Sequence, residues 1–207
     1  MSLPAFEAAA DRSDATAFLG RVVRLDPAAL VRLRSSGGAL TLWSWLPLDT
    51  LAARTVRGEG EGDVTVPAKA LLDALTAGAS ALPPRRDEGW RGAIPPDTPA
   101  EQLDAVPAEV VNGLLASAEK AFREASSGGD PQVVGDALGD QEVLQVTGGA
   151  HTVGIPLRAL LSCARMGFLG DDPIRVVVAG GWVGIRASFG VVYLRRGGRL
   201  ALFPTGR

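Results

Sequence analysis

Four short β-type runs separated by glycine turns close the chain. They cover residues 174–179, 182–187, 191–195 and 199–203, and the turns between them contain Gly180-Gly181, Gly190 and Gly197-Gly198. Short β-type runs with tight glycine turns are typical of an antiparallel meander. The sequence therefore predicts a fold that contains an antiparallel sheet, with four consecutive neighbouring strands at its C-terminal end.

Helices are predicted by a unit that recurs along the chain, in which a short β-type run meets a proline and an apolar helical stripe follows. The unit occurs at residues 22–33, 63–75 and 152–164, with Pro27, Pro67 and Pro156 at its centre. Proline keeps the preceding residue extended and is favoured in the first turn of a helix. Apolar residues at i, i+3 and i+4 then form the buried side of the helix. Residues 39–46 predict a further strand, and residues 107–125 a further helix.

These elements predict an α+β fold, with antiparallel strands and helices packed on one side. We expect residues 1–17 to form an N-terminal arm or short helix, and residues 18–207 to form one α+β domain. Residues 18–80 and 140–207 could be pseudo-repeats, joined by the proline-rich loop 82–100 and the helix 107–125. A loop of that length is uncommon inside a compact domain unless it has a function or links two units.

Composition says more about the cellular compartment of the protein than about its partner. The chain has a formal net charge of -2 and one cysteine, Cys163, so no intramolecular disulfide can form. No signal-peptide pattern and no apolar run long enough for a membrane helix occurs, and we expect a cytoplasmic protein with no membrane contact. Residues 150–207 contain eight arginines and two aspartates, whereas the remainder is acidic. The basic part therefore either pairs with the acidic part or faces an anionic partner.

The two faces of the predicted meander differ in chemistry. Alternate residues point to opposite faces of a strand, and one face is aliphatic. The other face collects arginines and aromatic rings, namely Arg175, Trp182, Arg186, Tyr193, Arg195, Arg199 and Phe203. Arginine contacts phosphates and aromatic rings stack on bases, so this face is a candidate single-stranded nucleic-acid or anion site. The alternative is a structural face, in which the arginines cover the aromatic rings and pair with acidic residues.

The loop 82–100 contains a second candidate, Trp90-Arg91, within five prolines. A tryptophan in a long loop either contacts a ligand or a partner, or anchors the loop to the body of the protein. Both interpretations remain open for Trp90 and Arg91.

Catalytic and metal-binding patterns are not predicted. His151 and Cys163 are the only histidine and cysteine, and Cys163 adjoins an apolar stripe, where a buried thiol is the ordinary role. One histidine and one cysteine do not supply the usual zinc ligands. No phosphate-binding loop, dinucleotide-binding glycine pattern or nucleophile elbow occurs, so we expect no cofactor, no metal and no catalytic residue.

Two resemblances follow from particular motifs. Trp90-Arg91-Gly92-Ala93-Ile94-Pro95-Pro96, Val106-Pro107 and Met166-Gly167-Phe168-Leu169 resemble a protein family of actinobacteria that has no assigned activity. Residues 64–72 and 155–161, which run from strand through proline into helix, are similar to the βα repeat of DNA polymerase processivity clamps. The chain differs from clamps in being much shorter and in having the loop and helix of residues 82–125, so no clamp function or site residue is carried over.

Three functions are consistent with this sequence. A non-enzymatic binding or protein-interaction module, acting on an unknown partner or on itself as a homodimer, is favoured because no catalytic constellation occurs. A single-stranded nucleic-acid binder would use the arginine and aromatic face. An enzyme would have its site near the loop 82–100.

Overall fold

One antiparallel sheet extends through the whole molecule. The computed structural model describes residues 2–126 and 130–196. Within them the sheet has the order β5-β2-β3-β4-β11-β10-β9-β6, with the short β1 paired to β4, and β7 and β8 form a separate hairpin. The strands are β1 (Ala5–Phe6), β2 (Leu30–Ser36), β3 (Ala39–Leu46), β4 (Thr50–Glu59), β5 (Asp63–Pro67), β6 (Glu101–Val106), β7 (Glu142–Gly148), β8 (His151–Pro156), β9 (Ile174–Ala179), β10 (Trp182–Ala187) and β11 (Gly190–Arg195).

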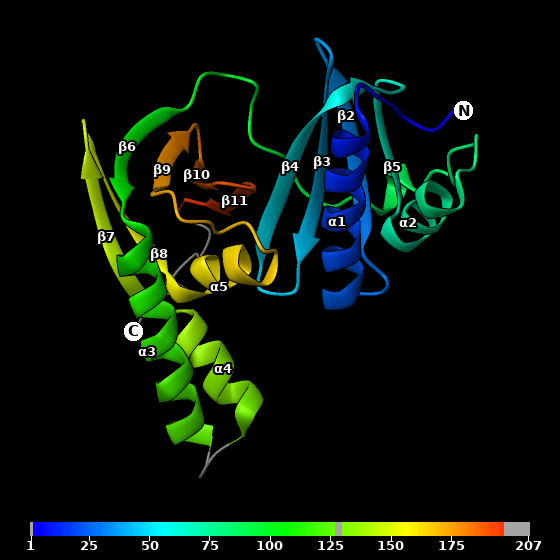
Figure 1. Cartoon of the computed structure of the whole chain (residues 1–207). Helices are drawn as coiled ribbons and strands as arrows, with labels where there is room; N and C mark the ends of the chain where they lie inside the picture. The colour runs from blue at the N-terminus through cyan, green and yellow to red at the C-terminus, as the bar shows by residue number, and fades with distance from the viewer. Residues whose placement is uncertain (1, 127–129, 197–207) are drawn as a thin grey trace, which may run out of the picture.

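Helices cover one face of this sheet (Figure 1). They are α1 (Ala9–Leu25), α2 (Ala68–Ala77), α3 (Ala108–Ser126), α4 (Pro131–Gly139) and α5 (Leu157–Arg165), and a short 3-10 turn covers Asp87–Gly89. Helices α1 and α2 lie beside each other on the N-terminal strands, and α5 packs on β4, β10 and β11. Their apolar stripes and the facing strand residues form one continuous core. The predicted α+β class, with helices packed on one side of antiparallel strands, is confirmed.

Most predicted elements form where the sequence placed them. Strands β9, β10 and β11 form the first three strands of the meander, whereas the fourth, residues 199–203, lies outside the described residues. Strand β3 covers the predicted residues 39–46, and β5-α2 and β8-α5 are strand-proline-helix units as expected. A third such unit, β6-α3, is formed around Pro107.

The unit predicted at residues 22–33 is wrong in both its parts. Residues 22–25 are the last turn of α1, and Leu30 begins strand β2. Phe18, Leu19 and Val22 form a helical stripe that is buried in the core, and this longer pattern outweighs the β-branched pair Val22-Val23. Helix α1 thus runs across residue 17, where we expected the arm to end and the domain to begin.

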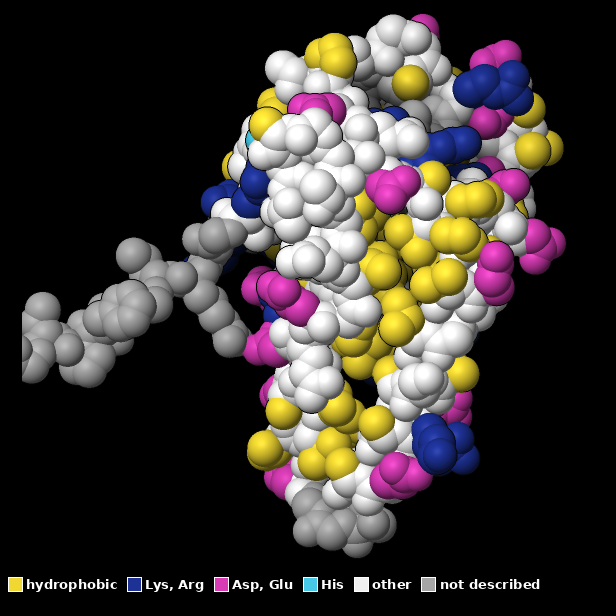
Figure 2. Space-filling model, turned by 90° about the vertical axis from the view of Figure 1, so that its left-hand side faces the viewer, with side chains coloured by type: hydrophobic (Ala, Val, Ile, Leu, Met, Phe, Trp, Pro, Cys, Tyr) yellow, Lys and Arg dark blue, Asp and Glu magenta, His cyan; other side chains and the backbone are white. Residues whose placement is uncertain are grey.

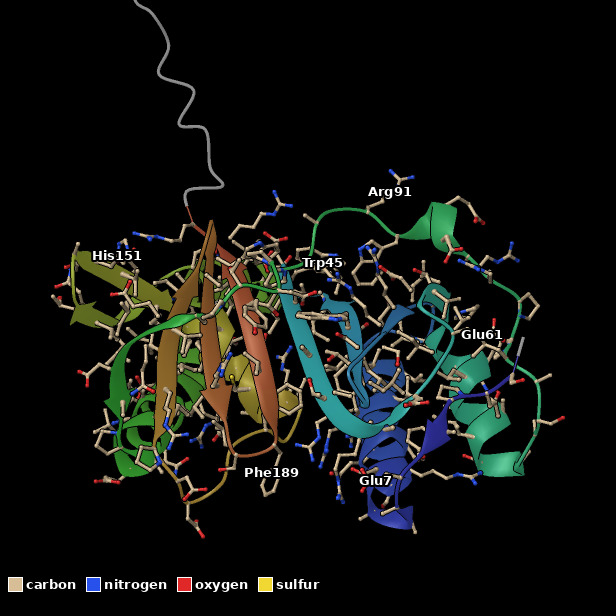
Figure 3. All side chains as sticks on the ribbon, turned by 90° about the horizontal axis from the view of Figure 1, so that it is seen from above. Glu7, Trp45, Glu61, Arg91, His151 and Phe189 are labelled. Atoms are coloured by element: carbon tan, nitrogen blue, oxygen red, sulfur yellow. The ribbon has the colours of Figure 1, made fainter. Side chains whose placement is uncertain are left out.

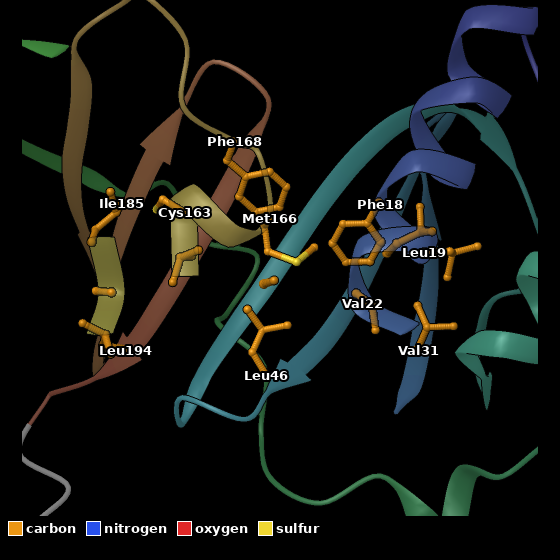
Figure 4. Close-up of a cluster of buried hydrophobic side chains, with 14 of the residues drawn as sticks. Phe18, Leu19, Val22, Val31, Leu46, Cys163, Met166, Phe168, Ile185 and Leu194 are labelled. Carbon is orange, nitrogen blue, oxygen red and sulfur yellow. The ribbon is translucent and has the colours of Figure 1, made fainter. Parts of the chain in front are cut away.

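The N-terminal elements β1 to α2 and the C-terminal elements β6 to β11 join in the middle of the sheet. Strand β11 pairs with β4 through Val191, Val192 and Tyr193. On the helical face, Phe18 of α1 stacks on Phe168, with ring centroids 6.3 Å apart (Figure 4). Both rings are almost completely buried. Backbone pairing and core packing therefore connect the two halves directly.

The C-terminal half also has an exposed apolar surface. Helix α3 buries Val111, but Val110 and Phe122 on the same helix are 42% and 37% exposed, and Val133 of α4 is 65% exposed. Figure 2 shows hydrophobic side chains gathered in a hollow on the side of the molecule where α3, α4, β6 and β7 lie. None of the described helices is both long enough and apolar enough to span a membrane.

Candidate functional site

An aromatic cluster lies on the face of the sheet opposite the helices. Trp43 and Trp45 are two residues apart on β3 and therefore point to the same side. The Trp43 ring lies 5.6 Å from the Tyr193 ring, and the Trp45 ring lies 6.2 Å from the Trp182 ring. Trp182 and Tyr193 meet edge to face at 6.4 Å. The cluster thus spans the line where the two halves join.

Close packing of this cluster depends on a glycine. A Cβ atom at position 184 would lie 2.8 Å from the Tyr193 ring and 2.9 Å from Val177, so only glycine lets that ring lie across β10. Burial raises the pKa of the Tyr193 phenol, and the nearby Arg186 opposes this effect. The phenol is therefore neutral at physiological pH.

Residues 82–100, which we call the strap, cross the outer face of the sheet and cover the cluster. Trp90 and Ile94 of the strap pack against the cluster, and Figure 3 shows Trp45 beneath the strap and Arg91 pointing away from the sheet. The guanidinium carbon of Arg32 lies 5.7 Å from the centre of the Trp90 ring, a cation–π arrangement. Trp90 therefore packs into the body, whereas the neighbouring Arg91 is exposed.

Polar contacts attach both ends of the strap to the N-terminal half. The Thr65 backbone N–H donates to the Asp87 carboxylate at 2.7 Å, and the Arg86 N–H donates to the Thr65 carbonyl at 2.8 Å. The hydrogen bond from Thr65 lowers the pKa of Asp87 below its ordinary value. Further along, Arg34 and Asp97 form an ion pair of 2.9 Å. The two hydrogen bonds with Thr65 cap the outer edge of β5, which would otherwise be open.

The structure separates the predicted arginine and aromatic residues of the meander into two groups. Arg175 and Arg186 are cross-strand partners and both are exposed. Trp182 and Tyr193 are only 6% and 8% exposed. Arg195 lies over the Trp182 ring, with its guanidinium carbon 5.0 Å from the ring centre. Arg199 lies outside the described residues.

This arrangement leaves arginines, but not rings, on the open surface. Arg195 on the Trp182 ring matches the structural alternative, in which arginine side chains cover the aromatic rings. Base stacking on Trp182 or Tyr193 would need the strap to move, because stacking requires an open ring face.

A cleft of about 740 Å³ lies beside the cluster, where the two halves meet; we call it the junction cleft. Six parts of the chain contribute to it: the end of β3, the β3–β4 turn, the strap, α4, α5 and β11. Its apolar surface comes from Trp45, Pro47, Leu48 and Leu194. Arg91 and Arg195 supply positive charge from the strap and β11, and Asp136 and Asp140 supply negative charge from α4 and its C-terminal end. Asp49 and Arg158 also line the cleft, which therefore combines apolar surface with both acidic and basic groups.

Two hydrogen-bond donors at this cleft have no acceptor within the described chain. The indole Nε1 of Trp45 and the Nε of Arg158 are both buried and unpartnered there. Arg158 uses another guanidinium nitrogen to contact Asp140. Buried donors without acceptors cost stability. Because both nitrogens have almost no solvent-accessible surface, an occupant of the cleft would not reach them directly.

The single histidine and single cysteine do not form a nucleophilic site. Cys163 is fully buried, and burial raises the pKa of its thiol to about 12, which leaves almost no thiolate at neutral pH. His151 lies at the start of β8, where its ring contacts Arg196 at 3.4 Å and Glu101 at 3.8 Å. Across residues 2–126 and 130–196, no group of three or more His, Cys, Asp or Glu side chains could hold a metal ion.

Most residues of the junction cleft were not predicted from the sequence. Asp136 and Asp140 belong to α4 and its C-terminal cap, and no helix was predicted in this part of the sequence. The signal was present: Asp130 caps α4 by accepting from the Gln132 N–H at 2.8 Å, and Pro131 occupies its first turn. Arg158 lay within a predicted helix but carried no sign of a site.

Known structures with this fold are bacterial β clamps. The chain is similar to the DNA polymerase sliding clamp of Caulobacter crescentus, with a TM-score of 0.58 and 14% identity over 99% of this chain and 66% of that one. It is similar to the Helicobacter pylori β clamp bound to a DNA ligase peptide, with a TM-score of 0.57 and 13% identity over 94% of this chain and 65% of that one. At these identities the likeness shows a shared fold, and this chain spans less than two thirds of those clamp chains.

Sequence comparison divides the chain near the strap. No curated protein matches it. Residues 4–92 match the model of a domain of unknown function, DUF8010, and residues 95–199 match that of a second, DUF8185. The two predicted resemblances, to a family without assigned activity and to processivity clamps, are thus confirmed, while the actinobacterial origin stays a prediction. Since its model matches just over half of the chain, the protein belongs to the family described as domain of unknown function DUF8185.

Proposed function

We propose that the protein is a non-enzymatic interaction module that binds a segment of a partner protein in the junction cleft. The observation that carries this proposal is the composition of the cleft, which combines apolar surface with acidic and basic groups. Polypeptide segments carry apolar, acidic and basic side chains together with backbone acceptors. Such a segment could contact the apolar lining and the groups of both charges at once.

Electrostatics favour a peptide over a nucleic acid in this cleft. Asp49, Asp136 and Asp140 line it together with Arg91, Arg158 and Arg195, so a run of phosphates would meet as many carboxylates as guanidinium groups. Single-strand binding surfaces usually combine a positively charged groove with open rings. The alternative function is nucleic-acid binding on the meander, which the exposed Arg175 and Arg186 favour. An enzyme with a site near the strap stays a further prediction.

The comparison with known structures adds fold-level support. One of the matching β clamps has a DNA ligase peptide bound to it. This scaffold is therefore compatible with peptide recognition, although the likeness transfers no binding residue to this chain.

A selection from a displayed library of random 12-residue peptides tests the proposal. We expect peptides that bind the whole protein and lose at least tenfold in affinity on Leu48→Asp or Arg91→Glu, which change the apolar lining and the charge of the cleft. Arg24→Glu, on α1 and away from the cleft, is the matched charge control and should leave the affinity unchanged. Peptides that bind all three variants equally, or a selection that yields none, would contradict the proposal.

The alternative function has its own assay. Salt-dependent binding of single-stranded DNA would favour the nucleic-acid surface if the double variant Arg186→Ala with Arg195→Ala abolished that binding. A labelled 20-nucleotide strand at low salt is the probe, and we expect no such binding.

Cytoplasmic location, a homodimer and a single domain with internal duplication are parts of the same proposal. The free, buried Cys163 is compatible with a reducing compartment. The exposed Val110 and Phe122 of α3 give a second copy an apolar surface to contact. Light scattering should therefore give the mass of a dimer, and Phe122→Glu should shift it to that of a monomer; a monomeric wild type would remove the dimer from the proposal.

A further inference from the structure

The β7–β8 hairpin has an open edge. The two-residue turn Gly149-Ala150 makes Gly148 and His151 the hydrogen-bonded pair that closes the hairpin. Pairs then alternate along the ladder, so Thr152 and Gly154 direct their N–H and C=O groups away from β7. In the described part of the chain, no backbone hydrogen bond from outside the hairpin reaches these groups. Two donors and two acceptors are therefore aligned for another strand.

A trough follows this edge. It has a volume of about 450 Å³, and Thr152, Val153 and Gly154 form one of its sides. Val183, Leu194 and Arg196 form the side opposite. The trough shares Asp140, Arg158, Leu194 and Arg195 with the junction cleft, so the two are continuous. An extended segment that lay along β8 would lead directly into the cleft.

Within the described residues, β8 lacks three of the devices that usually protect a strand edge, although a β-bulge lies in its partner strand β7. Natural edge strands are blunted by lysine, by proline within the strand or by a covering element. Strand β8 has no lysine, and its one proline, Pro156, is the last residue. The outer edge of β5, in contrast, is capped by residues 86 and 87 of the strap. Strand β8 thus combines an uncovered edge with an adjoining trough that can receive the side chains of an added strand.

Charge indicates the kind of segment that fits. The wall opposite β8 carries Arg195 and Arg196, with the His151 ring beside Arg196. Asp140 on the same trough is held by Arg158, which leaves Glu142 as the other acidic group of the lining. Leu194 and Val183 add apolar surface to the same lining. A strand that alternates acidic and apolar side chains matches this pattern, because successive side chains of a strand point to opposite faces.

We propose that the partner segment binds as an added β-strand along Thr152 and Gly154 of β8, and that it alternates acidic with apolar residues. This inference rests on the proposed peptide-binding function and specifies its mode and its ligand chemistry. Backbone hydrogen bonds would supply affinity and the alternate side chains specificity, as in other cases of strand addition. The six residues of β8 span about 20 Å, enough to pair with a segment of similar length.

The test uses a labelled octapeptide, Gly-Glu-Val-Glu-Val-Glu-Val-Gly, and the whole protein. We expect saturable binding by fluorescence anisotropy, at least tenfold weaker for the version with lysine in place of glutamate and for a scrambled peptide of the same composition. Arg196→Glu should weaken binding at least tenfold, whereas Arg24→Glu should not. Absence of binding, or equal binding of the scrambled peptide, would overturn the inference.

Two further measurements separate strand addition from other peptide binding. N-methylation of one alternate set of peptide nitrogens should weaken binding at least tenfold, and N-methylation of the other set should have less than a threefold effect. The amide hydrogens of Thr152 and Gly154 should exchange more slowly in the complex, while the Val153 amide, already bonded within the hairpin, serves as the reference.

The outcomes distinguish the two proposals. If cleft-binding library peptides are unaffected by N-methylation, peptide binding stands and strand addition is overturned. If no library peptide binds, both are overturned. Protection of the Thr152 and Gly154 amides in the free protein at dimer-forming concentrations would show that a second copy occupies the edge, and would also overturn the inference.

Discussion

A buried pair of hydroxyl groups connects the two halves beside the junction cleft. Thr50 begins β4, Ser162 lies in α5, and their side-chain oxygens are 2.8 Å apart with neither residue exposed. The Ser162 hydroxyl also donates to the Arg158 carbonyl at 2.7 Å. Since a hydroxyl has one hydrogen, Ser162 donates to Arg158 and accepts from Thr50. The two partners are therefore not equivalent, and their replacement should have unequal effects.

The size of each effect follows from what is left unpaired. Ser162→Ala removes the acceptor and leaves the Thr50 O–H buried without a partner, which should cost about 2 kcal/mol of unfolding free energy. Thr50→Val leaves the Ser162 hydroxyl bonded to Arg158 and removes only one accepted hydrogen bond, which should cost about 1 kcal/mol. The double variant buries apolar groups on both sides, so it should cost about 1 kcal/mol less than the sum.

Urea unfolding followed by tryptophan fluorescence and circular dichroism measures the four proteins of this cycle. For a chain of this size each kcal/mol lowers Tm by about 2–4 °C, so Ser162→Ala should melt about 4–8 °C below the wild type. Equal effects of the two single replacements, or strict additivity in the double variant, would refute the assigned direction of the hydrogen bond.

Three further predictions concern other parts of the molecule. The Cys163 thiol, with its pKa raised to about 12 by burial, should not react with a thiol reagent at pH 8 in the native protein but should react fully in urea, and rapid native labelling would contradict its burial. Gly184→Ala should destabilise by about 1–3 kcal/mol, because its Cβ would meet the Tyr193 ring, whereas Gly181→Ala, with no atom within 4 Å, should be near neutral; equal melting temperatures would refute the packing argument. The Arg32 hydrogen bond lowers the pKa of Asp63, so its stabilisation is present above the ordinary value of 3.8 and is lost as the pH falls below it. Asp63→Asn should therefore be destabilised by no more than about 1 kcal/mol at pH 6, and the difference from wild type in chemical unfolding should shrink as the pH falls below 3.8. A difference that grew on acidification would contradict this sign.

Local patterns explain most of the secondary structure that could be predicted. Residues 39–46 alternate, and the runs around Pro67 and Pro156 change from strand to helix where proline permits it, so β3, β5-α2 and β8-α5 follow from near neighbours in the sequence. The prediction for residues 22–33 was wrong because Val22 fits both a β-type run and the helical stripe that it shares with Phe18 and Leu19. The contact of that stripe with the sheet decides between the two, and it is a long-range contact.

The candidate site was less predictable because it is formed by distant segments. Trp90 and Arg91 stood out in the sequence, and both lie at or beside the cleft. The pairing of β4 with β11, which brings Trp45 next to Trp182, has no local signature. The open edge of β8 depends on which strands do not pair with it, and a sequence pattern that identifies a strand does not specify its neighbours.

The pairing of β4 with β11 has a consequence for how this architecture can be inherited. Residues 4–92 and 95–199 match separate models, yet one sheet runs through both. A gene rearrangement that separated them would leave two fragments, each with an unpaired strand edge and with one ring of the Phe18–Phe168 pair exposed to solvent. Such fragments would be prone to aggregate. Selection should therefore keep the two segments in one reading frame or in stable association.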